Sequence, residues 1–275
     1  MYKTQGNNAM EKPIRIGALI SGSGSNLDAV VSACEAGRIN GRVVFAGADN
    51  PGAPGLEKAR KKGIPTFVIN YSDIIRTFKS DPGRLSLPAD FDAEEIARKQ
   101  AVANPQTGER LRVFLGTRAI AEAGLIEQMA PYPFDLLILA GFMRNLTPYF
   151  IDRVNTDPGR PKIMNIHPAL LPAFPGTDGY GDTFRYGCKV GGCTVHFIDY
   201  GEDSGPVIGQ RCFPIGEDDT IDSVRQKGLE QEWSLYPECI RYFAEGRIHV
   251  VRQTHTLKNG RIYRRSVVKI ARDIH

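Results

Sequence analysis

Cysteine is scarce in this 275-residue sequence, and the few cysteines that occur are scattered. No CxxC motif, a spacing that zinc sites use, occurs among them, and they are too few for a disulfide scaffold. A disulfide-stapled secreted domain and a metal-binding module are therefore excluded, and a reducing cytoplasm is the expected compartment. The five cysteines are Cys34, Cys188, Cys193, Cys212 and Cys239.

Long apolar runs are also missing. No segment approaches the ~18 uninterrupted apolar residues of a membrane-spanning helix, and the polar stretch Met1–Pro13 has no apolar core of a secretory signal. The composition, with 41% hydrophobic and 24% charged residues, is ordinary for globular proteins and excludes disordered and collagen-like classes. The sequence therefore predicts a folded, soluble, cytoplasmic protein that does not act at a membrane.

Basic charge is concentrated near the C-terminus. The formal net charge of the chain is +4, but residues 246–275 alone carry eight Lys or Arg and one acid, Asp273. That segment has a charge of +7, which leaves −3 on the remaining residues. Because no set of aromatic side chains for base stacking accompanies these cations, we interpret them as an exposed ribbon and expect no nucleic-acid partner.

Apolar runs and helical periodicity alternate along the first seventy residues. Such a β-α-β-α-β order predicts a parallel sheet with right-handed crossovers. Leu136–Ala140 is the expected central strand, because a parallel strand buried on both faces shows no polar alternation. The expected strands are 14–20, 42–48, 66–69, 136–140, 162–165, 193–198 and 207–213, and the expected helices are 27–37, 55–62 and 220–243.

Two segments do not follow this alternation. Residues 73–133 contain no clear strand, which predicts an insertion between the third and fourth strands. Residues 249–275 contain Asn259-Gly260, a signal of a two-residue hairpin turn. We therefore predict an α/β fold with a single domain over 1–275: an open, mostly parallel Rossmann-like sheet with helices on both faces, the insertion, and a basic C-terminal antiparallel hairpin.

The first predicted strand ends in the turn Ser21-Gly-Ser-Gly-Ser-Asn26. Small residues let a ligand approach the backbone, and the free amides of the following helix N-terminus attract phosphate. Gly24, Ser25 and Asn26 are therefore candidate phosphate-binding residues, with Ser25 or Asn26 as the helix N-cap. A tight turn without a ligand is the alternative, since the pattern is neither GxGxxG nor GxxxxGK[ST].

Asn165-Ile-His167-Pro ends another predicted strand, at the edge where parallel sheets bind ligands. Residues 165 and 167 point the same way in an extended chain. An amide beside an imidazole can stabilise an oxyanion and move a proton, so Asn165 and His167 are candidate catalytic residues. The alternative is a capping asparagine and a core histidine.

The acidic loop Asp199–Pro206 could bring a carboxylate to His167 and favour its charged form. A solvated turn is the alternative, because Asp, Ser, Gly and Pro form turns readily. His196, His249 and His255 lie in strand or ribbon contexts, and we interpret them as structural or solvated.

Five motifs, in this order, resemble the folate-dependent formyltransferases. The similarity can be followed through 14–78 and 134–249, whereas we place no counterpart for the other residues. The motifs are ISGSGSNL (20–27), DLLILAGFMRN (135–145), MNIHPALLPAFPG (164–176), TVHFID with DSGPVI (194–208) and EQEWSLYP (230–237).

The resemblance implies that 10-formyltetrahydrofolate is the cosubstrate, and that its formyl group passes to the primary amine of glycinamide ribonucleotide, a step of purine biosynthesis. It implies that Asn165 and protonated His167 stabilise the oxyanion, and that Asp203 keeps His167 charged. Glu232 would contact the ribonucleotide, with a solvated helix residue as the alternative. The implied folate-binding residues are Met143, Arg144, Leu146, Ile198 and Asp199.

The sequence departs from the family near the acceptor. Thr177–Asp182 replaces a His-bearing segment, and Leu229 stands where some members have a phosphate-pairing lysine. Lys227 does not replace that lysine, because two residues correspond to about 200° of rotation around a helix. Another acceptor such as an amino-sugar nucleotide therefore stays open, as does a non-catalytic nucleotide- or RNA-binding protein.

The ends of the chain separate it from two groups of relatives. The residues before Ile14 are too few for the regulatory domain of formyltetrahydrofolate hydrolases, and those after Val250 too few for the barrel domain of methionyl-tRNA formyltransferases. The sequence leaves the choice between a monomer and a homodimer open.

Overall fold

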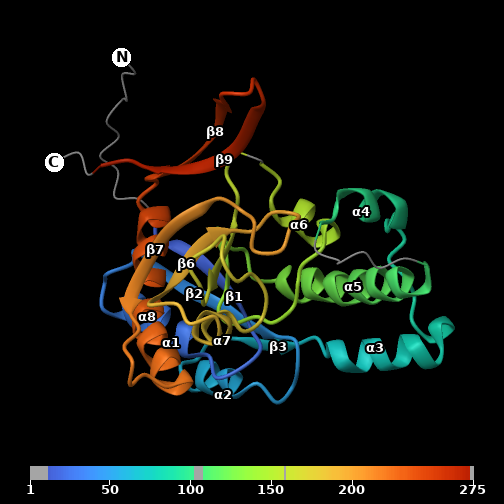
Figure 1. The fold of residues 1–275 in the computed structure, drawn as a ribbon. Coiled ribbons are helices and arrows are strands. Elements are labelled where there is room, and N and C mark those ends of the chain that lie inside the picture. The colour runs from blue at the N-terminus through green and yellow to red at the C-terminus, as the bar shows by residue number, and fades with distance from the viewer. Residues whose placement is uncertain (1–11, 102–107, 158, 273–275) are drawn as a thin grey trace.

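A computed structural model describes residues 12–101, 108–157 and 159–272 (Figure 1). In chain order the elements are β1 (Ile14–Ile20), α1 (Ser25–Glu35), β2 (Gly41–Ala48), α2 (Pro54–Lys61), β3 (Thr66–Val68), α3 (Tyr71–Ser80), the short 3-10 helix η1 (Pro82–Arg84), α4 (Ala93–Lys99), α5 (Gly108–Met129), β4 (Leu136–Leu139), α6 (Pro148–Val154), β5 (Ile163–His167), α7 (Gly179–Arg185), β6 (Val190–Phe197), β7 (Val207–Pro214), α8 (Ile221–Ala244), β8 (Ile248–Thr256) and β9 (Ile262–Ile270).

A seven-stranded sheet in the order β3-β2-β1-β4-β5-β6-β7 forms the centre of the molecule. Strands β3 to β5 pair in parallel, whereas β6 runs antiparallel to β5 and β7 antiparallel to β6. The predicted open, mostly parallel sheet is confirmed. The chain moves outward from β1 to β3 and then returns to β4 beside β1, so the strand order reverses at the β1–β4 boundary, the position where such sheets bind ligands.

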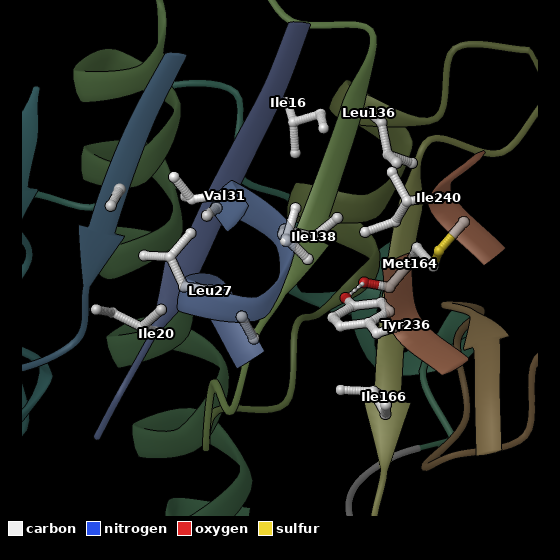
Figure 2. Close-up of a cluster of buried hydrophobic side chains, with 14 of the residues drawn as sticks. Ile16, Ile20, Leu27, Val31, Leu136, Ile138, Met164, Ile166, Tyr236 and Ile240 are labelled. Carbon is white, nitrogen blue, oxygen red and sulfur yellow. Dashed lines mark hydrogen bonds between the residues drawn. The ribbon is translucent and has the colours of Figure 1, made fainter. Parts of the chain in front are cut away.

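One face of the sheet packs against α1 and α8. Figure 2 shows Ile138 of β4 and Met164 of β5 directed toward Leu27 of α1 and Tyr236 of α8. The Tyr236 hydroxyl is fully buried and donates to the carbonyl oxygens of Met164 and Leu139, at 2.8 and 3.1 Å. Helix α8 is thereby fixed on the sheet by apolar contact and by a hydrogen bond that holds its register.

The opposite face packs against α5 and α6. Leu137 and Leu139 of β4 point to this side, as the alternation of strand side chains requires, and meet Leu125 and Met129 of α5. Within the predicted insertion 73–133, α5 is therefore the crossover helix that returns the chain from β3 to β4. Helices α3 and α4 lie beside α5, on the side of the molecule away from α8 (Figure 1).

Strands β8 and β9 form the predicted antiparallel hairpin, which projects from one end of the molecule (Figure 1). The predicted two-residue turn at Asn259-Gly260 is wrong. Thr256 pairs with Ile262, the Leu257 amide donates to the Arg261 carbonyl at 2.8 Å, and only Gly260 adopts a positive φ, of 78°. A two-residue type I′ turn needs positive φ at both central residues, so this chain instead forms a longer loop with left-handed glycine.

The described residues include no helix with both the length and the apolar character needed to cross a membrane. All five cysteines are free thiols.

Candidate active site

A cavity of about 430 Å³ opens at the carboxyl ends of β1, β4 and β5, where the strand order reverses. Its wall contains every residue predicted to take part in catalysis or binding. The turn predicted to bind phosphate lies at one part of this wall, and the loops after β4 and β6 form others. The fold thus brings together the three clusters that the sequence placed far apart along the chain.

Gly24 is the N-cap of α1 and adopts the left-handed conformation, with φ of 72° and ψ of 20°. No side chain caps this helix, so the predicted capping by Ser25 or Asn26 is wrong: the Asn26 amide is hydrogen-bonded elsewhere. A Cβ atom on Gly24 would lie 2.8 Å from the Cα atom of Gly55 in α2. Glycine is therefore required here by both backbone conformation and space.

His167 is buried, with 3% of its surface exposed, and both ring nitrogens face oxygen acceptors. Its Nδ1 lies 3.2 Å from Oδ2 of Asp203, and its Nε2 lies 2.8 Å from the carbonyl oxygen of Phe174. An imidazole between two acceptors makes both contacts favourable only when it carries two protons. His167 is thus held between the Asp203 carboxylate and a backbone carbonyl oxygen, while its role in catalysis stays a prediction.

His196 joins this cluster, which the sequence reasoning missed. It is fully buried, its Nε2 lies 3.3 Å from Nδ2 of Asn165 and 3.6 Å from Oδ1 of Asp203, and its Nδ1 lies 2.9 Å from the carbonyl oxygen of Phe197. Burial lowers the pKa of His196, which favours the neutral ring. A neutral His196 that donates from Nδ1 to Phe197 accepts from the Asn165 amide at Nε2, and so orients that amide.

The signal for His196 is the antiparallel pairing of β5 with β6, which places His196 directly opposite Asn165. Sequence patterns that predicted a parallel sheet gave no reason to align these two residues.

Glu232 of α8 is buried, with 4% of its surface exposed, so the solvated alternative is wrong. Its Oε2 accepts a hydrogen bond of 2.6 Å from Nδ2 of Asn26, and its Oε1 accepts one of 2.7 Å from the Tyr180 hydroxyl. Burial raises the pKa of this carboxyl, whereas the two hydrogen bonds oppose that rise. The cavity thus contains a carboxyl group held by two neutral donors, Asn26 and Tyr180.

The predicted folate-binding residues line the wall formed by the loops after β4 and β6. Met143 is 60% exposed at the cavity mouth, whereas Leu146 is buried. The Arg144 guanidinium donates from Nε to Oδ2 of Asp49, at 2.5 Å, and lies over the ring of Tyr71. Asp49 is itself buried and was not predicted, because its pairing with Arg144 joins the segments that follow β2 and β4, two strands that lie on either side of β1.

The cations of α8 differ in where they point. Lys227 donates from Nζ to Asp219, at 2.6 Å, and is not part of the cavity wall, so the prediction that it does not replace the missing lysine is confirmed. Leu229 and Arg225 both line the cavity. Arg225 donates to Oδ1 of Asp178, at 3.1 Å.

No group of three or more His, Cys, Asp or Glu side chains with the geometry of a metal site occurs in the described part of the chain.

Comparison with known proteins identifies the family. The model of the Formyl transferase family matches residues 14–240, so the chain belongs to the formyl transferase family. Within it, the chain is similar to phosphoribosylglycinamide formyltransferase of Escherichia coli (strain K12), with 32% identity over 235 residues that cover 86% of this chain and 89% of that protein. The Bacillus subtilis (strain 168) protein of the same name is 31% identical, over 80% of this chain and 90% of its own length.

Other relatives differ in length. The trifunctional purine biosynthetic protein adenosine-3 of Chironomus tentans is 30% identical over 86% of this chain, but the chain spans only 14% of that protein. The crystal structure of glycinamide ribonucleotide transformylase 1 from Symbiobacterium toebii has a TM-score of 0.68 and 34% identity, and covers 97% of this chain and 99% of that chain. This match extends beyond the residues of the family model into the segments for which we placed no counterpart.

Proposed function

We propose that this protein transfers the formyl group of 10-formyltetrahydrofolate to the primary amine of glycinamide ribonucleotide, in purine biosynthesis in the cytoplasm. The observation that carries the proposal is one cavity, in a chain of the formyl transferase family, that contains Asn165, the His167–Asp203 pair and the glycine turn of α1. Relatives with matching lengths have the corresponding name.

The chemistry needs no covalent enzyme intermediate. The amine nitrogen attacks the formyl carbon, the carbonyl oxygen becomes an oxyanion, the bond to the folate nitrogen breaks, and a proton passes from the amine to that nitrogen. A charged His167 stabilises the oxyanion together with the second amide proton of Asn165, the one that His196 does not accept. Asp203 holds the charge on His167 and is close enough to relay a proton through water.

The two substrates fit different parts of the cavity. The amides of Gly24, Ser25 and Asn26 open into it without a side-chain cap, which suits the phosphate of a ribonucleotide. The wall with apolar Leu146 and positively charged Arg144 suits a folate, which has an aromatic ring system and a carboxylate tail. Holding both substrates in one cavity lowers the entropic cost of their reaction.

A spectroscopic formyl-transfer assay tests this proposal with glycinamide ribonucleotide, its unphosphorylated form and an amino-sugar nucleotide as acceptors. We expect turnover with the first and at least about 100-fold lower kcat/KM with the others, because they lack a phosphate at the position that the α1 amides bind. Turnover with the amino-sugar nucleotide alone would assign another acceptor. Absence of turnover with all three would favour a non-catalytic nucleotide-binding protein.

A further inference from the structure

Tyr180 occupies the segment in which this sequence departs from its family. It lies on α7, is 5% exposed, and donates its hydroxyl proton to Oε1 of Glu232, at 2.7 Å. Burial and the nearby Glu232 charge raise the pKa of Tyr180, so the phenol remains a donor at neutral pH. Both residues line the cavity. The altered segment thus contacts the acceptor site from within the protein.

A glycine of α8 leaves the space that the Tyr180 ring fills. A Cβ atom on Gly228 would lie 2.1 Å from Cζ of Tyr180. Glycine inside a helix costs about 1 kcal/mol relative to alanine, so Gly228 weakens α8 unless the ring uses that space. Tyr180 and Gly228 therefore form a matched pair between α7 and α8.

The carboxyl group that Tyr180 holds has no Lys or Arg beside it, and the titratable group that acts on it through its charge is His167, which lowers the pKa of Glu232. Across the described residues, no Lys or Arg forms an ion pair with Glu232, whose hydrogen bonds come from neutral groups of Tyr180 and Asn26. Each carboxyl oxygen keeps a second lone pair. Buried acceptors of this kind bind neutral donors such as a pair of sugar hydroxyl groups, provided that the carboxyl group does not rotate.

We propose that Tyr180 is a positioning residue that determines acceptor specificity: its hydroxyl fixes the Glu232 carboxyl group so that the free lone pairs meet the sugar hydroxyl groups of the acceptor. The inference rests on the proposed function, since it needs a ribose-containing acceptor in this cavity. Tyr180 itself does not touch the reacting atoms. Its loss should therefore weaken acceptor binding and leave the folate site unchanged.

The variant Tyr180→Phe removes only the hydroxyl group and keeps the ring beside Gly228. We expect KM for glycinamide ribonucleotide to rise roughly 10-fold or more, which corresponds to the loss of one hydrogen bond to a charged group. KM for 10-formyltetrahydrofolate should stay within about twofold, because Tyr180 is not near that wall. Tyr263→Phe makes the same chemical change on the exposed hairpin and should leave both values unchanged.

If Tyr180 had only a structural role, its replacement would not change how acceptor binding depends on pH. Without the Tyr180 donor the charged form of Glu232 loses a hydrogen bond, so acceptor binding by Tyr180→Phe should weaken more steeply as pH falls than binding by the wild type. Gly228→Ala pushes the ring away without removing the hydroxyl, and should raise the acceptor KM similarly. The double variant with Tyr180→Phe and Gly228→Ala should have the same acceptor KM as either single variant, because both changes break the same contact between Tyr180 and Glu232.

Calorimetry with ribose 5-phosphate separates this inference from the proposed function. If the wild type binds this probe but does not formylate glycinamide ribonucleotide, the proposed function fails while the binding comparison still tests Tyr180. Equal affinity of wild type and Tyr180→Phe for ribose 5-phosphate would overturn the inference, as would a wild type that does not bind the probe. Should Tyr180→Phe fail to fold, Gly228→Ala provides the same comparison.

Discussion

Asp203 has a φ of 48°, in the left-handed region where residues other than glycine are uncommon. Phe174, the other acceptor beside His167, has a φ of 52°. A strained backbone conformation persists only where the surrounding structure holds it in place, and it is often found at functional sites. Here both residues with positive φ place an oxygen atom beside the His167 ring. The positive φ values of Asp203 and Phe174 therefore accompany the two contacts that hold the His167 ring.

Replacing Asp203 by asparagine tests that arrangement. Asp203→Asn keeps the size of the side chain but removes the negative charge that favours a doubly protonated His167, so we expect kcat to fall by about 10²- to 10⁴-fold. The melting temperature should change little. Steady-state kinetics with Asp218→Asn, an exposed acid distant from His167 in the sequence, provides the control. Near-wild-type turnover in Asp203→Asn would contradict the assigned role.

Glu122 on α5 is a buried acid that the mechanism does not use. It is fully buried, and its oxygens accept hydrogen bonds from the Thr147 amide and hydroxyl, at 2.7 and 2.6 Å. Burial raises the pKa of Glu122 to about 8. The folded state therefore binds a proton that the unfolded state has released, so this group makes the free energy of unfolding fall as pH rises from about 4.5 to about 8.

The variant Glu122→Gln should remove that dependence, since glutamine is neutral and can still accept from the Thr147 amide. We expect the difference in melting temperature between about pH 6 and about pH 9 to be smaller in Glu122→Gln than in the wild type. Glu127→Gln changes an exposed acid on the same helix and should behave like the wild type. Parallel pH profiles for all three proteins would refute the role of Glu122.

Single residues were predictable where they are neighbours in the sequence. Asn165 and His167 follow from strand alternation, and Gly24 from its place in a glycine turn. His196 could not be predicted, because it meets Asn165 across two strands whose pairing the local sequence does not encode. Asp49 could not be predicted because it meets Arg144 across the end of the intervening strand β1. Contacts between distant segments depend on sheet register, which amino-acid patterns specify only in part.

The turn between β1 and α1 allows a matched test of two glycines. Gly24 and Gly37, at the two ends of α1, have φ values of 72° and 70°. At Gly24, an added Cβ atom would come within 4 Å of the backbone of Gly55 in α2. At Gly37, an added Cβ atom would have no neighbour within 4 Å among the described residues. Alanine should cost about 1 kcal/mol of stability at either position, because the left-handed conformation disfavours a Cβ atom. The added contact with Gly55 should displace the turn in Gly24→Ala alone.

We therefore expect Gly24→Ala to raise KM for the ribonucleotide by about 10-fold or more, since the amides that bind phosphate move with the turn. Gly37→Ala should retain the wild-type KM. Chemical denaturation measures the stability of both variants, and initial rates measure KM. A normal KM in Gly24→Ala would mean that this turn does not bind the phosphate.

A hydrogen bond links the hairpin to the loop that carries Asp203. Arg265 of β9 donates from Nη2 to the carbonyl oxygen of Ser204, at 3.0 Å, directly after the strained Asp203. Because an exposed hydrogen bond contributes little, Arg265→Ala should lower kcat by only about 2- to 5-fold. Arg264→Ala removes a neighbouring exposed cation and should have no effect. Equal rates in the two variants would show that the hairpin does not support the loop.

Elements were more predictable than their connections. The strand at Leu136–Leu139 and helix α8 follow from apolar patterns, but the hairpin turn depends on which residues adopt positive φ, which Asn-Gly alone does not decide. The role of α5 was equally hidden, because residues 73–133 read as an insertion although their last helix is a crossover of the sheet. The apolar pattern of a helix does not identify which element the helix packs against.

At the scale of the molecule, the C-terminal hairpin and the helical segment between β3 and β4 fall within the part of the chain that a solved structure matches. The Symbiobacterium toebii structure covers 97% of the chain and so includes most of both segments. The fold class was predictable because alternating strands and helices leave few possible topologies. The full set of residues around the cavity was not predictable, because segments from β1 to α8 had to meet there.

The hydrogen bond between Asn26 and Glu232 joins residues 206 positions apart, so its two partners are made at very different times during translation. When a ribosome has produced His167 and the turn before α1, α8 and its Glu232 are still unmade. Under the proposed function, a chain that ends before α8 lacks part of the acceptor site, so we expect it to transfer no formyl group.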